Sequence, residues 1–157
     1  MMNFFYKSKK LRVRVAAIIQ DDNGNILFIK QKKNKKDYWL LPGGGIEFGE
    51  SAESALAREL KEELELEIEN PEFVCLSENI DPEGNRHLLQ LVFKTKVKSG
   101  TPNIPKNETV VLDFKFFSLE ELQTIEIRPD IKDFLKSNPK LEMNSIYLKT
   151  KWISDTK

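Results

Sequence analysis

The segment 38–64 constrains the fold of this chain more than any other. Residues 38–41 (YWLL) form a short apolar run, Pro42 and three glycines interrupt that run, and residues 51–64 (SAESALARELKEEL) then have the period of a helix. Proline lacks a backbone N–H and glycine readily leaves extended or helical conformations, so both end regular elements. The segment therefore predicts a strand, a sharp glycine turn and a helix in immediate succession.

The predicted helix gathers three carboxylates along the border of its apolar side. Glu59, Glu62 and Glu63 are related by three and four residues, which brings their side chains together. Glu59 and Glu63 are a like-charge pair at i, i+4, which costs roughly 0.2–0.5 kcal/mol when exposed and more when half-buried. Two arrangements offset that repulsion: a solvated acidic face partnered by Lys61 and Arg58, which also fits a protein-interaction surface, or a bound cation.

The sequence around the helix favours the cation. Lys61 lies away from the carboxylate side of the helix, and the backbone of Pro-Gly-Gly-Gly can pass close to an ion or a phosphate without a Cβ in the way. Mg²⁺ takes oxygen ligands, commonly one or two carboxylates together with waters and substrate phosphates. The cluster therefore predicts a divalent-metal site beside the glycine turn.

Residues 44–66, GGIEFGESAESALARELKEELEL, resemble the Nudix box, written G-x5-E-x7-R-E-U-x-E-E-x-G-U with U an aliphatic residue. The matching positions are Gly44, Glu50, Arg58, Glu59, Leu60, Glu62, Glu63 and Leu66. The one departure is Glu65, which stands where the box has its last glycine. In the family this glycine closes the helix in a left-handed conformation, which costs another residue ~1 kcal/mol. No carboxylate is lost by the change.

The resemblance implies a Nudix-like α/β/α sandwich around a mixed β-sheet and a metal-dependent hydrolase of diphosphate bonds. It implies that Glu59, Glu62 and Glu63, with the backbone carbonyl of Gly43, bind Mg²⁺ or Mn²⁺. Arg58 and Glu50 would pair with each other or with the ligating carboxylates to fix their geometry. A metal-activated water would attack phosphorus, and either a cluster glutamate or the loop residue Glu108 would take the proton.

The substrate depends on residues outside the box. Pro82 lies 16 residues beyond Leu66, where ADP-ribose pyrophosphatases of the family resemble one another in having a proline, although a β-turn at residues 81–85 explains it equally well. We therefore expect ADP-ribose or a similar nucleotide-sugar, with a MutT-like nucleoside triphosphate pyrophosphohydrolase as the alternative. A non-catalytic nucleotide-binding sensor of the same family is a second alternative, which the complete set of box carboxylates disfavours.

Four further residues are candidates for contact with the substrate: Gly44, Trp39, Arg14 and Glu108. Each has a plainer explanation beside the functional one. A tryptophan in a short strand is more often part of the core, an arginine on an alternating strand is more often solvated, and Glu108 in PKNETV fits an exposed turn.

The rest of the chain reads mostly as strands. We expect strands at 11–20, 26–30, 38–41, 73–76, 87–97, 110–117 and 145–152, and short helices at 118–122 and 130–137. The first two strands should form a hairpin across the turn 21–25, the lysine-rich stretch 32–37 should be a solvated loop, and Ser118 with Glu121 has the pattern of a capping box. One long helix among many strands predicts a mixed α/β sandwich.

Composition narrows the cellular setting. The 157 residues fit one domain spanning 1–157, and 25 basic residues balance 25 acidic ones, so we expect a small-molecule nucleotide diphosphate as partner and no nucleic-acid polymer. The single cysteine, Cys75, sits in an apolar stretch as a buried residue would, and no apolar run approaches the ~18 residues of a membrane span, so we expect a cytoplasmic protein. Homodimers are frequent among similar enzymes, but no segment identifies an interface.

Overall fold

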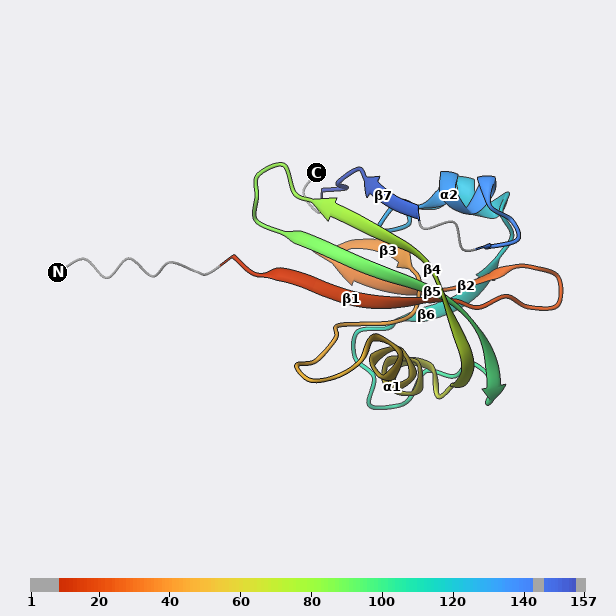
Figure 1. Cartoon of the computed structure of the whole chain (residues 1–157). Coiled ribbons are helices and arrows are strands. Elements are labelled where there is room, and N and C mark those ends of the chain that lie inside the picture. The colour runs from red at the N-terminus through yellow and green to blue at the C-terminus, as the bar shows by residue number, and fades with distance from the viewer. Residues whose placement is uncertain (1–8, 143–145, 155–157) are drawn as a thin grey trace.

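Two β-sheets with helices on their outer sides form the framework of the protein (Figure 1), which the computed structural model describes over residues 9–142 and 146–154. The elements in chain order are β1 (Leu11–Ile18), β2 (Ile26–Lys33), β3 (Lys36–Leu40), α1 (Ala52–Leu64), β4 (Glu67–Ile80), β5 (His87–Ser99), β6 (Asp113–Phe117), the 3₁₀ helix η1 (Glu121–Thr124), α2 (Lys132–Ser137) and β7 (Ile146–Thr150).

The larger sheet has the order β1-β5-β4-β7 and mixes directions, because β1 pairs with β5 and β4 with β7 in parallel whereas β4 and β5 are antiparallel. The smaller sheet, β3-β2-β6, is antiparallel throughout. In Figure 1, α1 lies on one side of the strands and α2 on the other. The mixed α/β sandwich expected from the sequence is confirmed.

The predicted hairpin of the first two strands is wrong. The turn at residues 21–25 is present, with Asp21 Oδ1 accepting the N–H groups of Asn23 and Asn25 at 2.9 Å each. The pairing around it is limited to the isolated bridge between Gln20 and Ile26 and the bond from Leu27 N–H to Ile19 O at 2.9 Å, so β1 and β2 form no ladder. Beyond that bridge the strands separate into different sheets. The reason is burial: residues 15–18 are all 0% exposed, so the second half of β1 is covered on both faces, as a strand segment between two layers must be.

The prediction that the lysine-rich stretch 32–37 is a loop is also wrong, because these residues form a hairpin. Strand β2 continues through Lys33 and β3 begins at Lys36, which leaves only Asn34 and Lys35 to make the turn. Both have positive φ, 49° and 65°, as the two central residues of a type I′ hairpin turn require. Exposed lysines are compatible with such a hairpin because their charged ends stay in water.

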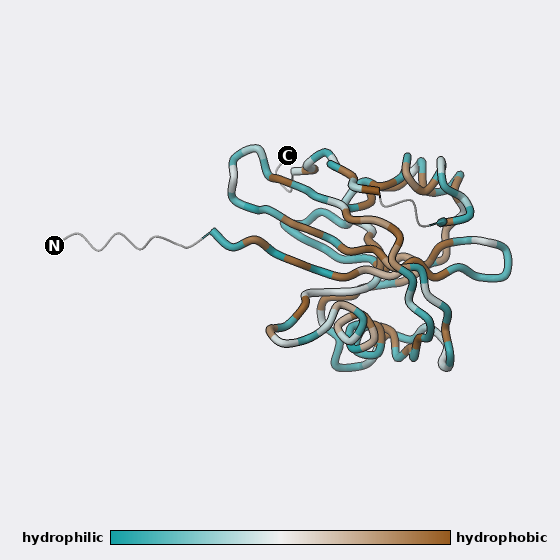
Figure 2. Tube along the Cα trace, viewed as in Figure 1, coloured by the Kyte–Doolittle hydropathy of each residue, from teal (hydrophilic) through white to brown (hydrophobic). Residues whose placement is uncertain are grey.

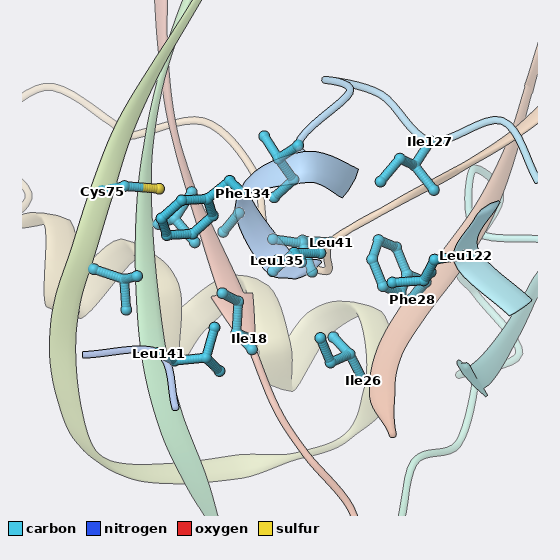
Figure 3. Packing of buried hydrophobic residues seen from close by; sticks show 14 of the residues in the cluster. Ile18, Ile26, Phe28, Leu41, Cys75, Leu122, Ile127, Phe134, Leu135 and Leu141 are labelled. Carbon is cyan, nitrogen blue, oxygen red and sulfur yellow. The ribbon is translucent and has the colours of Figure 1, made fainter. Parts of the chain in front are cut away.

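Two apolar clusters hold the layers together. One packs α1 against the sheets through Leu56, Leu60 and Leu64, each 0% exposed. The other lies on the α2 side and includes Phe28, Phe134 and the residues labelled in Figure 3. Figure 2 shows hydrophobic residues concentrated where the strands meet the helices, and hydrophilic ones along the β1–β2 turn. Cys75 is buried in the second cluster, and burial raises the pKa of its thiol to about 12, which makes it unreactive.

Helix α1 ends at Glu65, which adopts the left-handed conformation with φ 56°. Its N–H donates to Lys61 O at 3.1 Å, which is the bond of the αL helix ending, and the N–H of Leu66 donates to Leu60 O at 3.2 Å. The chain therefore retains the expected helix end with a residue other than glycine.

The remaining expectations differ mainly at element boundaries. Ser118 and Glu121 form the predicted capping box, with Ser118 N–H donating to Glu121 Oε2 at 2.9 Å and Glu121 N–H to Ser118 Oγ at 3.2 Å. Strand β4 is much longer than the predicted 73–76, and β7 lies within the predicted 145–152, of which residue 145 falls outside the described residues. Among the described helices, none is long and apolar enough to cross a membrane.

Candidate active site

The glycine loop that follows β3 is wedged between β1 and α1. Val15 N–H donates to Gly44 O at 2.9 Å, and the N–H of Gly43 donates to Glu63 Oε2 at 2.8 Å. A Cβ at Gly43 would lie 2.2 Å from the Val15 carbonyl oxygen. A Cβ at Gly44 would lie 2.2 Å from the carboxylate carbon of Glu59. Glycine at position 43 therefore lets the loop lie against the backbone of β1, and glycine at position 44 leaves the space that the Glu59 carboxylate occupies.

Arg58 links the loop to the carboxylates. Its Nε and Nη2 donate to the two carboxylate oxygens of Glu50 at 2.9 Å each, and its Nη1 donates to Glu59 Oε1 at 2.8 Å. Nη2 also donates to Gly45 O at 3.0 Å. The bond from Arg58 lowers the pKa of the Glu50 carboxyl, and the Glu50 carboxylate raises the pKa of the guanidinium. The bidentate pair fixes the guanidinium and thereby the orientation of Glu59.

Glu62 and Glu63 differ sharply in their surroundings. The Glu62 side chain is 59% exposed, whereas Glu63 is only 7% exposed. Burial raises the pKa of Glu63 to about 8, while the Gly43 N–H and the charge of Arg14 act in the opposite direction. Helix α1 therefore carries one buried carboxylate, one half-buried carboxylate bound to Arg58, and one solvated carboxylate.

Arg14 fastens the glycine loop from the side of β1. Its Nη2 donates to Gly43 O at 2.8 Å and to Leu41 O at 3.2 Å. Burial lowers its pKa, but an arginine remains charged. The residue lies in the cleft wall described below, but its visible contacts are to backbone carbonyls. Gly43 O keeps a second lone pair beside the bond from Arg14.

Strand β3 presents Tyr38, and not Trp39, to this region. Trp39 packs edge-on against Phe117 at a centroid distance of 4.7 Å and against the core on the α2 side. Trp39, a candidate substrate contact in the sequence, does not line the cleft, because alternation along the strand turns it to the face opposite to that of Tyr38 and Leu40. Tyr38 lines the cleft, and the guanidinium of Arg128 lies 4.5 Å from its ring centroid.

A cleft of about 460 Å³ joins these parts. Its acidic members are Glu59, Glu62, Glu63 and Glu108. Its basic members are Arg12, Arg14, Lys33, Arg86, Arg128 and Lys151. The carboxylates of α1 lie at the end formed by the glycine loop, and cationic side chains line the other walls. Such a cleft suits an anionic ligand that arrives with a cation, or that shares a cation with the carboxylates of α1.

Glu108 reaches the cleft from the loop between β5 and β6. Its Oε1 accepts the N–H groups of Val110 at 2.5 Å and Val111 at 3.1 Å, and its charge contributes to the raised pKa of Glu63. The structure thus brings together Glu50, Arg58, the three glutamates of α1, Glu108, Arg14 and the glycine loop.

Sequence reasoning missed the residues that build the rest of the cleft. These are chiefly Tyr38, Asn79, Arg128 and residues 151–153. Alternation in the strand at 38–40 was a usable signal for Tyr38, because it separates that residue from Trp39. For Arg128 and residues 151–153 no local signal exists, since they come from segments far along the chain.

The donor set fits a divalent cation. Within residues 9–142 and 146–154, no three side chains of His, Cys, Asp or Glu are arranged to hold an ion as they stand. All three glutamates have partners within the protein, Glu59 and the exposed Glu62 with Arg58, and Glu63 with the Gly43 N–H. Yet three carboxylates and a loop without Cβ atoms face one cleft, and hard cations prefer such oxygen donors.

Comparison with known proteins agrees with this geometry. Residues 10–137 match the model of the NUDIX domain. The chain is 35% identical over 129 residues to the ADP-ribose pyrophosphatase of Methanocaldococcus jannaschii, covering 79% of this chain and 73% of that protein. It is 33% identical over 129 residues to an RNA pyrophosphohydrolase of Campylobacter jejuni subsp. doylei, covering 73% of this chain and 81% of that one. A crystal structure of a MutT NUDIX hydrolase from Burkholderia pseudomallei matches with a TM-score of 0.64 and 30% identity, over 71% of this chain and 85% of that chain.

Proposed function

Because the chain belongs to the NUDIX domain family, we propose that it hydrolyses the diphosphate linkage between a nucleoside and a second group, and that ADP-ribose or a similar nucleotide-sugar is its substrate. One observation carries the proposal: the carboxylates of α1 occupy one end of a cleft whose other walls are cationic. An anionic diphosphate fits the cationic walls, but approaches the carboxylates only if a cation lies between them.

Glu59, Glu62 and Glu63, together with the carbonyl of Gly43, would hold Mg²⁺ or Mn²⁺. When bound, the ion lowers the pKa of a water and offsets charge on the phosphate oxygens. The contribution of the protein is preorganisation. Arg58 holds Glu59 in place at 2.8 Å, and Gly44 leaves the space that the Glu59 carboxylate occupies.

Glu108 is the proposed general base. Its carboxylate lines the cleft with the glutamates of α1, and two backbone N–H groups fix one of its oxygens. A base must be held within hydrogen-bond reach of the water that it deprotonates. The position of Glu108 on the cleft wall, and the fact that it is not one of the proposed ligands, support this role. A Glu108→Gln variant should lose turnover but keep metal affinity, whereas loss of both would place Glu108 among the ligands.

The substrate proposal rests on the relative from Methanocaldococcus jannaschii, which is named an ADP-ribose pyrophosphatase. Pro82 adds little support, because it lies in a turn closed by the bond from Gly84 N–H to Asp81 O at 2.8 Å. The second candidate is the end of a triphosphate, either a nucleoside triphosphate or the 5′ end of an RNA. The name of the relative from Campylobacter jejuni favours that candidate, and the six basic residues in the cleft would accommodate a triphosphate.

The test is release of nucleoside monophosphate or diphosphate from ADP-ribose, nucleotide-sugars, diadenosine polyphosphates, nucleoside triphosphates and 5′-triphosphorylated RNA, with Mg²⁺ or Mn²⁺. Glu62→Gln should abolish turnover. Glu53→Gln is the matched control, because Glu53 is an exposed residue of α1 outside the cleft. ADP-ribose as the best substrate would support the proposal, and preference for a triphosphate would move the assignment to the second candidate. Metal-dependent nucleotide binding without turnover of any compound would show a sensor.

A further inference from the structure

The segment that follows β7 completes the cleft. Lys151, Trp152 and Ile153 all line it, although they lie beyond residues 10–137, where the family match ends. We propose that Trp152 is the platform on which the base of the substrate stacks, so that the C-terminal segment forms a base subsite. This inference rests on the proposed function only in taking the ligand to be a nucleotide.

Asn79 fixes the point at which this segment leaves the sheet. β7 runs parallel to β4 (Figure 1), with Thr150 opposite Asn79 in the register. Asn79 is 6% exposed, and its Nδ2 donates to Thr150 Oγ1 at 2.9 Å, to Lys151 O at 3.1 Å and to Thr150 O at 3.3 Å. Thr150 Oγ1 in turn donates to Glu78 O at 3.1 Å. The buried Asn79 side chain thus holds the backbone beside Trp152, which gives the proposed subsite a rigid support.

Trp152 differs from the other tryptophan in what covers its ring. Trp39 packs on Phe117 and on the core of the α2 side. Trp152 is half-buried, lines the cleft, and belongs to neither of the two apolar clusters formed by the described residues. A large apolar ring beside charged groups gains most from a ligand that offers it a flat face. A planar nucleobase offers such a face over its whole ring system, and a lone phosphate offers none.

The neighbours of Trp152 favour the same ligand. Across the larger sheet, Arg12, Leu88, Asn79 and Thr150 are successive partners in the register. Leu88 contributes an apolar side chain to the cleft, between Arg12 and Asn79 in the register. Lys151 contributes a cation next to Trp152. Tyr38 on the smaller sheet already has the Arg128 guanidinium over its ring at 4.5 Å. Trp152 is therefore the better platform of the two.

The two ends of the cleft are separated by the width of the sheet. The glycine loop is bridged to β1 at Gly45, whereas Trp152 follows β7, three strands away. Three strand spacings correspond to roughly 14 Å. A ligand that spans them is extended, with its diphosphate at the carboxylates and its base at the C-terminal segment.

Intrinsic fluorescence tests this directly, because the chain has two tryptophans. AMP should quench the emission of the wild-type protein, and ribose 5-phosphate, which lacks the base, should not. Trp152→Phe should abolish the quench, while Trp39→Phe should retain it. Quenching that persists in Trp152→Phe, or that ribose 5-phosphate produces equally, would overturn the proposal. This readout does not depend on turnover.

Kinetics on the best substrate of the panel separate the two proposals. Stacking on an aromatic side chain corresponds to about a 5- to 150-fold change in affinity, so Trp152→Ala should raise KM within that range and leave kcat nearly unchanged. Trp152→Phe should restore most of the affinity, and the exposed Lys149→Ala on β7 serves as the control. An unchanged KM in Trp152→Ala, with turnover still abolished by Glu62→Gln, overturns the subsite alone. If no compound is turned over while AMP quenches Trp152, the hydrolase assignment fails and the subsite stands.

Discussion

The two ends of the cleft are built in different ways. At the acidic end, α1 and the glycine loop belong to one continuous stretch of sequence, and they interlock through glycines, a bidentate ion pair and a buried carboxylate. At the opposite end, the walls come from strands β1 to β5 and the segment after β7, which meet only because the sheets bring them together. The first arrangement leaves little freedom for substitution. The second allows one scaffold to hold different ligands.

Among substitutions of residues that shape the cleft without being proposed ligands or the proposed base, the largest effect is expected at Gly44, which lies against Glu59. Gly44→Ala should lower activity about 10- to 100-fold, since its Cβ would lie 2.2 Å from the Glu59 carboxylate and must displace it. Gly45→Ala is the matched control, because a Cβ there meets nothing within 4 Å. Equal losses in the two variants, measured as kcat/KM, would show that the loop merely needs to be flexible.

Stability should respond to the buried carboxylate of Glu63. Burial raises its pKa from the ordinary 4.5 to about 8, so its stabilising contribution is present in full below pH 4.5 and is lost as the pH rises through 8. Glu63→Gln keeps an acceptor for the Gly43 N–H and removes the titration. In metal-free protein at pH 8 to 9 the variant should therefore be more stable than the wild type by about 1–3 kcal/mol.

Urea unfolding in EDTA at pH 5 and pH 8.5 measures this difference, and the gain in stability should be larger at the higher pH. A gain that is the same at both values would mean that the Glu63 carboxyl does not titrate between them.

A smaller effect is expected at the other end of the cleft. Asn79→Leu removes three hydrogen bonds to residues 150 and 151 while keeping the shape of the side chain. It should raise KM about 5-fold, as expected for loss of roughly 1 kcal/mol of positioning, with kcat nearly unchanged. A fall in kcat with constant KM would assign Asn79 to the chemistry, and so remove the distinction between the two ends.

The smallest change concerns the end of α1. Glu65→Gly should stabilise the protein by ~1 kcal/mol, because φ 56° is unfavourable for glutamate, and should leave activity unchanged. The bond from Asn103 Nδ2 to Glu65 Oε2 at 2.6 Å is exposed, so its loss offsets little of the gain. A shift of the urea midpoint at constant m-value measures it. A destabilised variant would mean that this bond outweighs the backbone strain.

The contrast between the ends also explains what could be predicted from the sequence. Glu59, Glu62 and Glu63 could be placed on one side of a helix because helical period is a local property. Arg58, Glu50 and the glycines belong to the same local pattern. The choice between core and cleft for Trp39 could not be made from the sequence, because a strand turns adjacent residues to opposite faces and only the packing of the layers decides which face meets the cleft.

Long-range pairing decides the rest. The turn 21–25 was recognisable, but its chemistry does not reveal that β1 leaves it to pair with β5. The lysines of residues 32–36 would be solvated in a loop or in a hairpin. The two residues with positive φ that form the hairpin turn, Asn34 and Lys35, are not glycines, so the sequence does not mark the turn. Trp152 reaches the cleft only through the parallel pairing of β7 with β4.

Metal binding by α1 tests the central claim most directly. Titration of Mn²⁺ followed by electron paramagnetic resonance should show a bound ion in the wild-type protein and in Glu53→Gln. Glu62→Gln should bind it at least about 10-fold more weakly. Equal binding by the wild type and Glu62→Gln would contradict the assignment of the cleft as a metal-dependent hydrolase site.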